Sequence, residues 1–309
     1  MALPLGYSDG SMKPTVFIQA NRRQYLGAVI GEHALKRNSR HADSFDVRIM
    51  LQEDVPVFHE YEGKRYLFDG HPRTWRNNDL QSFTPLRFLP PELMGYQGRA
   101  VVIDPDIFAV ADVWDLLNRE MDGKALLCRT RFWEDGTVRY RASSVMLLDC
   151  AKLTHWRMED TLRDMFTCRW DYLDWVNLNR EPEENIGTLE DQWNDFDTLT
   201  PETKMLHNTK RRTQPWKTGL PVDFNQSDKV LFGINFAWLR NLRNLSRGLP
   251  ARGRYKPHPD KNQENLVFGL LRECLDSGKV SESQLRKEMS ANHLRHDALE
   301  LVRRAPALP

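Results

Sequence analysis

The feature that most constrains this chain is a short apolar run that leads directly into two carboxylates. Residues 99–103 are continuous and almost wholly apolar, which is typical of a central strand. Asp104-Pro105-Asp106 follows at once. Since open α/β sheets bind ligands in the crevice beyond their strand ends, this placement predicts a binding site if the sheet is of that kind.

The N-terminal region predicts the kind of sheet. Residues 16–20 are apolar and β-branched at their start, and residues 45–51 alternate, so both segments are expected to be strands. Between them, apolar side chains recur at helical spacing and predict a helix over residues 23–37. A strand, a helix and a second strand form the unit of a mostly parallel sheet flanked by helices, so the predicted fold class is α/β.

Composition excludes several classes of protein. The 309 residues include 44 Lys or Arg and 43 Asp or Glu, and the net charge of +1 argues against a globally basic nucleic-acid-binding protein. The nine Trp and fourteen Phe argue against disorder. No apolar run approaches the roughly 20 residues of a membrane-spanning helix. The N-terminus has neither the basic start nor the apolar core of a signal peptide.

The cysteines indicate a compartment. Cys128, Cys150, Cys168 and Cys274 show no Cys-x-x-Cys spacing, so neither a zinc ribbon nor a redox pair is predicted. Together with the N-terminus, this spacing leads us to expect a cytoplasmic protein with reduced thiols.

The remaining segments divide the chain into two expected parts. In chain order we expect a polar excursion over residues 52–80, an irregular helical stretch over 80–94, a helix over 111–120, strands over 125–128 and 145–148, and a helical, aromatic stretch from 158 to about 200. Residues 240–261 then carry seven Lys or Arg and one acid, and two amphipathic helices are expected over 264–276 and 281–302. We therefore predict a first domain over 1–224 and a helical, basic module over 225–309.

The two carboxylates suit a metal ion. Asp104 and Asp106 at the end of a strand can turn toward one point, and Pro105 between them restricts the backbone. Hard oxygen donors favour Mg²⁺ or Mn²⁺, which usually bridge protein carboxylates to substrate phosphates. The alternative is an ordinary pair of acids, because Asp195-Phe196-Asp197 is a second Asp-x-Asp in the same chain.

A second signal lies a hundred residues further on. His207 precedes a basic loop and the run Pro215-Trp216-Lys217, so this segment could supply a nitrogen ligand and phosphate-binding charge together. Imidazole beside two carboxylates favours Mn²⁺ over Mg²⁺. The alternative is a surface His beside a solvated basic turn.

Several segments together resemble a known family in order and spacing. They are Val16 to Tyr25, Ser82 to Leu93, Arg99 to Phe108 with its Asp-x-Asp, Ser143 to Leu153, and Leu206 to Trp216. Over residues 15–220 the chain resembles the retaining, metal-dependent glycosyltransferases that include glycogenin and the bacterial lipopolysaccharide galactosyl- and glucosyltransferases.

The resemblance implies a fold, an activity and a set of site residues. It implies an A-type nucleotide-sugar-binding fold that holds Mn²⁺, with Mg²⁺ as the alternative, through Asp104, Asp106 and His207. It also implies transfer of a hexose from a UDP-sugar, with retention, to a glycan, a lipid-linked glycan or a protein. The donor-binding residues implied are Ala20, Asn21, Tyr25, Arg87, Asp104, Asp106, His207, Lys210 and Lys217. Within this set Tyr25 would stack on uracil, or pack as an ordinary helix residue, and Arg87 would contact the nucleotide, or be a solvated Arg.

The chain also departs from the family pattern. Ser143-Ser144 stands where the family has Asn-Ala-Gly, and Gln214 stands where it has the lysine of Lys-Pro-Trp. Lys210, Arg211, Arg212 or Lys217 could replace that charge. The family's Asp-Gln-Asp turn is matched only loosely, and Asp174 is the residue that we expect in the catalytic position, with an ordinary helix-end acid as the alternative.

Two other functions remain open from the sequence. A catalytically inert domain of the same fold could bind a partner through the basic C-terminal module. A nucleotidyltransferase would also use strand-end carboxylates, but residues 21–24 lack the glycines usual after the first strand of that class. The basic stretch 240–261 could bind an anionic acceptor, contact an anionic membrane peripherally, or be solvated.

Overall fold

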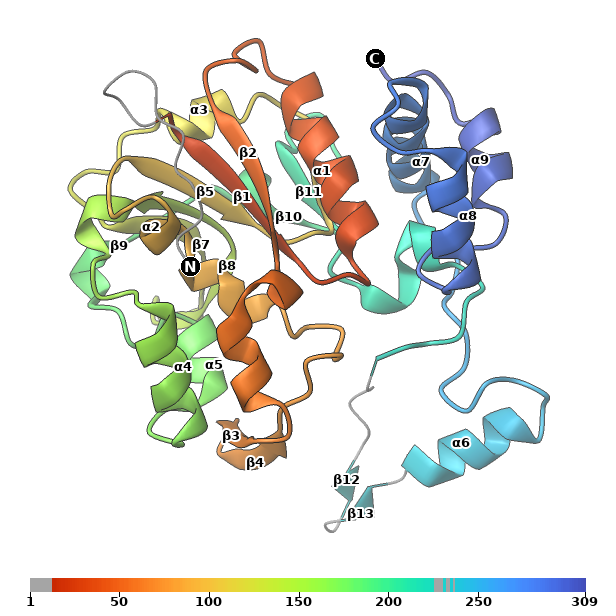
Figure 1. Ribbon diagram of the computed structural model, residues 1–309, viewed down its shortest axis with the longest axis horizontal. Helices are drawn as coiled ribbons and strands as arrows, with labels where there is room; N and C mark the ends of the chain where they lie inside the picture. The colour runs from red at the N-terminus through yellow and green to blue at the C-terminus, as the bar shows by residue number, and fades with distance from the viewer. Residues whose placement is uncertain (1–12, 225–229, 232–233, 236) are drawn as a thin grey trace.

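The computed structural model describes residues 13–224, 230–231, 234–235 and 237–309. Residues 1–12, for which the sequence predicts no signal peptide, lie outside the described residues. The centre of the fold is a six-stranded sheet with helices on both sides (Figure 1). Its strands, in spatial order, are β2 (Asp46–Leu51), β1 (Thr15–Ala20), β5 (Arg99–Ile103), β8 (Val138–Asp149), β7 (Leu126–Phe132) and β9 (Ile186–Thr188).

The pairing of these strands confirms a mixed, mostly parallel sheet. β1 runs parallel to both β2 and β5, and β9 runs parallel to β7. β8 is antiparallel to its two neighbours, β5 and β7. The helix α1 (Tyr25–Arg37) connects β1 to β2, as predicted.

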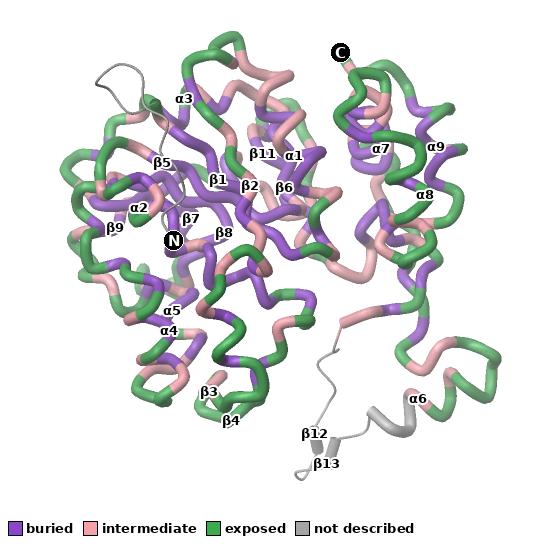
Figure 2. The backbone as a smooth tube through the Cα atoms, in the orientation of Figure 1, coloured by how far each residue is buried: buried purple, intermediate pink, exposed green. Residues whose placement is uncertain are grey.

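The central strands are buried on both faces because helices and loops cover each side (Figure 2). In β1 and β5, Phe17 and Val102 face a largely aromatic core, whereas Ile18 and Val101 face the opposite, aliphatic core. Each such side chain contributes about 1.5–3 kcal/mol through its removal from water. The strand predicted at residues 99–103 is confirmed residue for residue.

A second sheet brings residues 195–207 back to the end of β5. It has three strands, in the order β10 (Asp195–Phe196), β11 (Met205–His207) and β6 (Ile107–Ala109). β11 pairs antiparallel with β6, so His207 lies opposite Ile107. This register places His207 next to the turn that follows β5.

The polar excursion over residues 52–80 is an ordered part of the fold. It contains two 3-10 helices and a hairpin of two strands, β3 (Arg65–Phe68) and β4 (His71–Thr74). The hairpin packs against α4 (Met158–Phe166) and α5 (Tyr172–Val176).

Several predicted elements differ in extent from those observed. The helix predicted over 111–120 is the single turn α3 (Trp114–Leu117), and the strand predicted over 145–148 is part of the twelve-residue β8. The helical stretch predicted from 158 to about 200 ends after α5, where Leu178 has a positive φ and Pro182 follows. The helix predicted over 281–302 is two helices, because Asn292 is left-handed just after the first.

The remaining elements are mostly short, apart from α7. The helices are α2 (Pro90–Leu93), α6 (Ala237–Leu245), α7 (Lys261–Asp276), α8 (Glu282–Ser290) and α9 (Ala298–Arg304), and the strands are β12 (Val230–Leu231) and β13 (Ile234–Asn235). The 3-10 helices are η1 (Gln52–Asp54), η2 (Pro56–Tyr61), η3 (Thr84–Phe88), η4 (Cys150–Lys152), η5 (Glu183–Asn185), η6 (Asp191–Asn194), η7 (Arg211–Thr213) and η8 (Pro215–Lys217).

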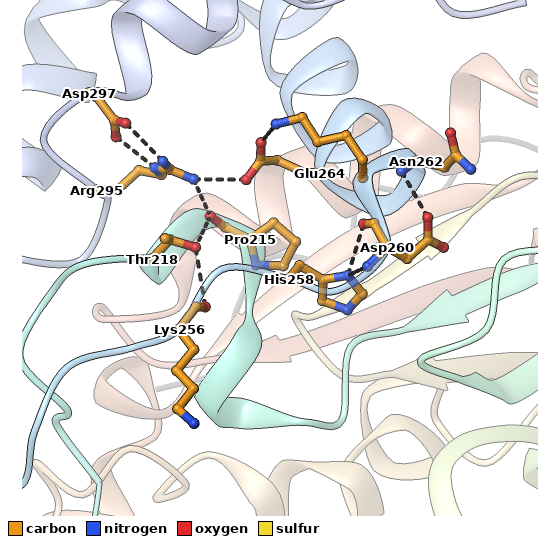
Figure 3. A network of polar contacts seen from close by, with 10 residues as sticks. Pro215, Thr218, Lys256, His258, Asp260, Asn262, Glu264, Arg295 and Asp297 are labelled. Atoms are coloured by element: carbon orange, nitrogen blue, oxygen red, sulfur yellow. Dashed lines mark hydrogen bonds and ion pairs between the residues drawn. The ribbon is translucent and has the colours of Figure 1, made fainter.

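The C-terminal helices α7, α8 and α9 share a core with α1. Val29 and Ile30 of α1 pack in one cluster with Leu270 and Leu271 of α7. Arg295 closes the same region by donating to Glu264 Oε2 at 2.9 Å and to the Pro215 carbonyl at 3.3 Å (Figure 3). The division of the chain at residue 224 stays a prediction.

None of the helices in the described ranges has both the length and the hydropathy needed to cross a bilayer.

Candidate active site

Asp104 lies at the C-terminal end of β5 and is held in place from two sides. Its side chain is buried and accepts hydrogen bonds from Gln19 Nε2 of the neighbouring strand β1 and from Arg87 Nε, the latter at 3.1 Å. Arg87, in η3, also donates from Nη1 to Ser143 Oγ of β8 at 3.0 Å. The Asp104 carboxylate is therefore held by Gln19 of β1 and by Arg87, which is itself bonded to Ser143 of β8.

Asp106 and His207 meet at the end of the second sheet. His207 Nε2 lies 3.4 Å from Asp106 Oδ1. Gln214 Nε2 donates to the other oxygen, Oδ2, at 3.1 Å. The Asn208 amide donates to the Asp106 carbonyl at 3.1 Å, which ties the two chain segments together.

The orientation of the His207 ring follows from its buried neighbour Asn194. The Asn194 amide nitrogen Nδ2 donates to Ser144 Oγ at 2.9 Å, so its oxygen Oδ1 faces His207 Nδ1, also at 2.9 Å. Because an amide oxygen only accepts, Nδ1 is the donor in this contact, and Nε2 is the ring nitrogen that faces Asp106. This is the ring orientation of an imidazole that ligates a metal through Nε2.

These three side chains fit a divalent metal ion. One ligand atom from each of Asp104, Asp106 and His207 lies within 4.8 Å of the others, and within the described ranges they form the one group of this kind. Two carboxylates and an imidazole suit Mn²⁺ and, less well, Mg²⁺. The second Asp-x-Asp lies elsewhere: Asp195 accepts from Thr203 Oγ1 at 2.8 Å and Asp197 accepts from the Lys210 amide at 3.0 Å.

The turn that carries both aspartates is supported by α1. Gly27 passes so close to it that a Cβ at this position would lie 2.4 Å from the Pro105 carbonyl oxygen. Only glycine permits this approach. One turn further along α1, a Cβ on Gly31 would lie 3.2 Å from the Ile107 carbonyl oxygen.

A cavity of about 270 Å³ opens over the three candidate ligands. Its polar walls carry the guanidinium groups of three arginines together with small hydrogen-bonding groups. The lining residues are Gln24, Leu80, Gln81, Phe83, Arg87, Asp104, Pro105, Asp106, Tyr140, Arg141, Ala142, Ser143, Ser144, Val176, Asn177, His207, Thr209, Arg211 and Gln214. Asp104 and Asp106 are the only carboxylates among these described residues.

Of the predicted donor-binding residues Ala20, Asn21, Tyr25 and Arg87, only Arg87 lines the cavity. Arg87 lines the cavity beside Asp104. Asn21 is buried behind it and donates to the Asp79 carbonyl at 3.1 Å, so it supports the wall rather than lining it. Ala20 is buried at the end of β1, and Tyr25 is 42% exposed outside the lining, where Gln24 stands instead.

The predicted basic residues also separate. Lys210 is exposed, and neither it nor Lys217 lines the cavity. Lys217 is 1% exposed, and its Nζ lies 3.0 Å from Asp223 Oδ2, because burial of this amine requires a carboxylate partner. Burial lowers the pKa of Lys217, while Asp223 opposes that shift. Arg211, which the sequence left among several candidates, is the basic residue of this segment that lines the cavity.

Asp174, expected in the catalytic position, points elsewhere. It is exposed in the first turn of α5 and accepts from Asn179 Nδ2 at 3.1 Å. Val176 and Asn177, at the C-terminal end of α5, line the cavity instead. The catalytic assignment of Asp174 stays a prediction with no cavity contact behind it.

Sequence reasoning missed several residues of the site. Gln19 was readable as a polar residue inside an apolar strand, and Asn194 directly precedes the second Asp-x-Asp. Tyr140 and Arg141 gave no signal, since they enter the site only through the length of β8.

The chain was compared with known families, curated proteins and solved structures. No family model and no curated protein matches the chain. Among solved structures, glycosyltransferase GlyE of Streptococcus pneumoniae TIGR4 is 17% identical with a TM-score of 0.46, and the match covers 67% of this chain and 56% of GlyE. Galactosyltransferase LgtC is 12% identical with a TM-score of 0.46, covering 66% of this chain and 89% of LgtC.

Mouse xyloside xylosyltransferase 1 is 13% identical with a TM-score of 0.41, covering 64% of this chain and 97% of that protein. The chain thus spans little more than half the length of GlyE. Each of these matches covers about two thirds of this chain at a TM-score below 0.5, and the function is argued from the site.

Proposed function

We propose that this protein is a retaining glycosyltransferase that transfers a hexose from a UDP-sugar to a glycan, a lipid-linked glycan or a protein. The observation that carries the proposal is the meeting of Asp104, Asp106 and His207 at the strand ends, within one polar cavity. These side chains would hold Mn²⁺, which when bound neutralises the charge of a diphosphate and orients it.

The cavity walls suit a diphosphate leaving group. Arg87, Arg141 and Arg211 place guanidinium groups around a cavity whose carboxylates would be occupied by the metal. Guanidinium groups pair with phosphate oxygens in two-pronged geometry, and fixed cations stabilise negative charge as it develops on a leaving group. The chain therefore supplies the electrostatic part of diphosphate departure from its own residues.

The neutral groups of the cavity suit a sugar. Tyr140, Ser144 and Asn177 offer hydroxyl and amide groups, and the donor hexose would lie against them. Hydrogen bonds of this kind discriminate between sugars that differ at one hydroxyl, because a mismatched sugar leaves a polar group unpaired.

The cellular setting belongs to the same proposal. All four cysteines are free thiols, which fits a reducing compartment, and we place the protein in the cytoplasm. Leu242 and Leu245 of α6 are exposed at 56% and 57% beside Arg243 and Arg247, which suits peripheral contact with an anionic membrane.

The test is turnover with a panel of UDP-glucose, UDP-galactose and UDP-N-acetylglucosamine in the presence of Mn²⁺. We expect UDP release from at least one donor, an α-linked product by NMR, and loss of turnover in Asp104→Asn or with excess chelator. Asp195→Asn, in the second Asp-x-Asp, is the matched control and should retain turnover. Full activity of Asp104→Asn, or turnover unaffected by chelator, contradicts the proposal.

One observation favours a second function, an inert binding domain of the same fold. Gln214 stands where a lysine is expected, and its amide is committed to Asp106 and the Asn208 carbonyl. The described lining also offers no carboxylate beyond the candidate ligands. Binding of UDP without turnover of any donor would favour this function.

A further inference from the structure

A second, larger cavity adjoins the candidate active site. Its volume is about 730 Å³, and it shares Leu80, Gln81 and Arg211 with the first cavity. The hairpin β3–β4 forms one side of its wall together with Tyr172 of α5, and the two elements lie together in Figure 1. A molecule in the second cavity would therefore lie next to a donor in the first.

One face of the hairpin is aromatic. In the antiparallel register Tyr66 pairs with Arg73, and Phe68 is two residues further along the same face. Trp75 and Tyr172 complete this wall, with the ring centroids of Phe68 and Tyr172 5.5 Å apart. Burial raises the pKa of Tyr172 to about 12, so this phenol stays neutral at physiological pH.

Two arginines add positive charge to the aromatic wall. The Arg73 guanidinium lies 3.7 Å above the Phe68 ring, and that of Arg211 lies 5.7 Å from the Phe224 ring. Neither forms an ion pair with a carboxylate of the described residues, and Asp171, an electrostatic partner of Arg73, lies outside the lining. By contrast Arg76 is paired with Glu62 at 3.1 Å.

The cavity has little negative charge to balance these arginines. Asp79 is the one acid among its described lining residues, and its Oδ1 accepts from the Gln81 amide at 2.9 Å. A pocket with aromatic walls and unpaired guanidinium groups suits a ligand that has an apolar face and an anionic group. A saccharide that carries a carboxylate or phosphate has both features, since pyranose rings present C–H faces.

We propose that this cavity is the acceptor subsite and that it takes an anionic saccharide, whose charge is held by Arg73 and Arg211. The assignment of this cavity as an acceptor subsite rests on the proposed function, whereas binding of the saccharide does not depend on it. The acceptor and the donor would then meet at the shared residues Leu80, Gln81 and Arg211, where a hydroxyl of the acceptor can reach the first cavity.

Binding to the full chain, without any donor, tests the proposal. The probes are cellobiouronic acid, glucose 6-phosphate and neutral cellobiose, titrated by NMR at low ionic strength. We expect one or both anionic probes to bind at least tenfold more tightly than cellobiose, and the tighter one identifies carboxylate or phosphate as the preferred group. Equal binding of cellobiose, or no binding of either anionic probe at millimolar concentration, overturns the proposal.

Variants locate the binding. Arg73→Gln is expected to weaken the anionic probe tenfold or more, and Arg211→Gln is expected to act similarly. Arg65→Gln is the matched control, because Arg65 lies on the same hairpin but does not line the cavity. Equal effects of Arg65→Gln and Arg73→Gln would contradict the assignment. Loss of UDP-sugar turnover across all donors, with Arg73-dependent binding retained, would refute the proposed activity and leave the saccharide site standing.

Discussion

The Nδ1 atom of His207 lies 2.9 Å from the amide oxygen of Asn194, which orients the imidazole so that Nε2 faces Asp106. Asn194 thus acts as a positioning residue for the proposed metal site. Replacement of Asn194 by Leu removes the acceptor and frees the other tautomer, so we expect Mn²⁺ affinity to fall about 10- to 100-fold.

The control for this prediction is Asn194→Asp, which keeps an oxygen acceptor opposite Nδ1. We expect its Mn²⁺ affinity to stay closer to that of the wild type. Titration of Mn²⁺ by electron paramagnetic resonance measures both variants. An Asn194→Leu protein that binds Mn²⁺ like the wild type would show that the asparagine has only a packing role.

Gly27 should be sensitive even to alanine. The added Cβ would lie 2.4 Å from the Pro105 carbonyl oxygen, so either α1 or the metal-binding turn must move. We expect Gly27→Ala to destabilise the protein by about 1–3 kcal/mol and to weaken Mn²⁺ binding. Gly31→Ala, with its milder 3.2 Å contact, should have the smaller effect in urea unfolding. The reverse order would contradict the described approach of α1 to the turn.

Asp171 should make the hairpin sensitive to acid. It accepts hydrogen bonds from the amides of Asp69, Gly70 and Leu173, at 3.0, 2.7 and 2.7 Å. Burial alone would raise the pKa of Asp171, but these amides hold it below its ordinary value. The unfolded state therefore binds the proton more readily, so the stabilisation is present above about pH 4 and is lost as the pH falls through the lowered pKa.

Urea unfolding at pH 7 and pH 3 tests the role of Asp171. Asp171→Asn should lose about 1.5–3 kcal/mol at pH 7 and show a smaller difference between the two pH values than the wild type. Asp174→Asn is the control, since that exposed side chain accepts a single hydrogen bond from Asn179. The same pH dependence in Asp171→Asn and in the wild type would show that the Asp171 carboxylate does not stabilise the hairpin.

Lys217 is expected to act on stability rather than on donor binding. Its buried amine is paired with Asp223, so Lys217→Met should cost about 3 kcal/mol and leave the UDP affinity of the folded protein unchanged. Lys210→Met, at an exposed position, should change stability by less than about 0.5 kcal/mol. If UDP affinity falls in Lys217→Met while stability is kept, the lysine contacts the donor as the sequence predicted.

The sequence was sufficient to predict what local pattern determines. The apolar run into Asp104 fixed β5 and the position of the first carboxylates, because a buried strand has few alternatives. His207 was identified as a candidate metal ligand because it precedes a basic loop and the run Pro215-Trp216-Lys217. Its contact with Asp106 depends on the pairing of β11 with β6, which joins residues about a hundred positions apart.

Other features depend on long-range packing that no local pattern encodes. The hairpin β3–β4 has mostly exposed residues and becomes the wall of a cavity only through α5 and Arg211. The burial of Lys217 depends in turn on Asp223 and on the C-terminal helices, whose Asn292 carbonyl lies 3.5 Å from its amine. Basic residues near a predicted site therefore could not be sorted into structural and donor-facing ones from sequence.

The most direct test of the account is binding of UDP with and without Mn²⁺, in the wild type and in Asp106→Asn, measured by thermal unfolding. At 100 times its dissociation constant, UDP should stabilise the wild type by about 2.7 kcal/mol when Mn²⁺ is present. We expect no comparable stabilisation without Mn²⁺ or in Asp106→Asn. Stabilisation by UDP that needs neither Mn²⁺ nor Asp106, or no stabilisation of the wild type at all, would contradict the central claim.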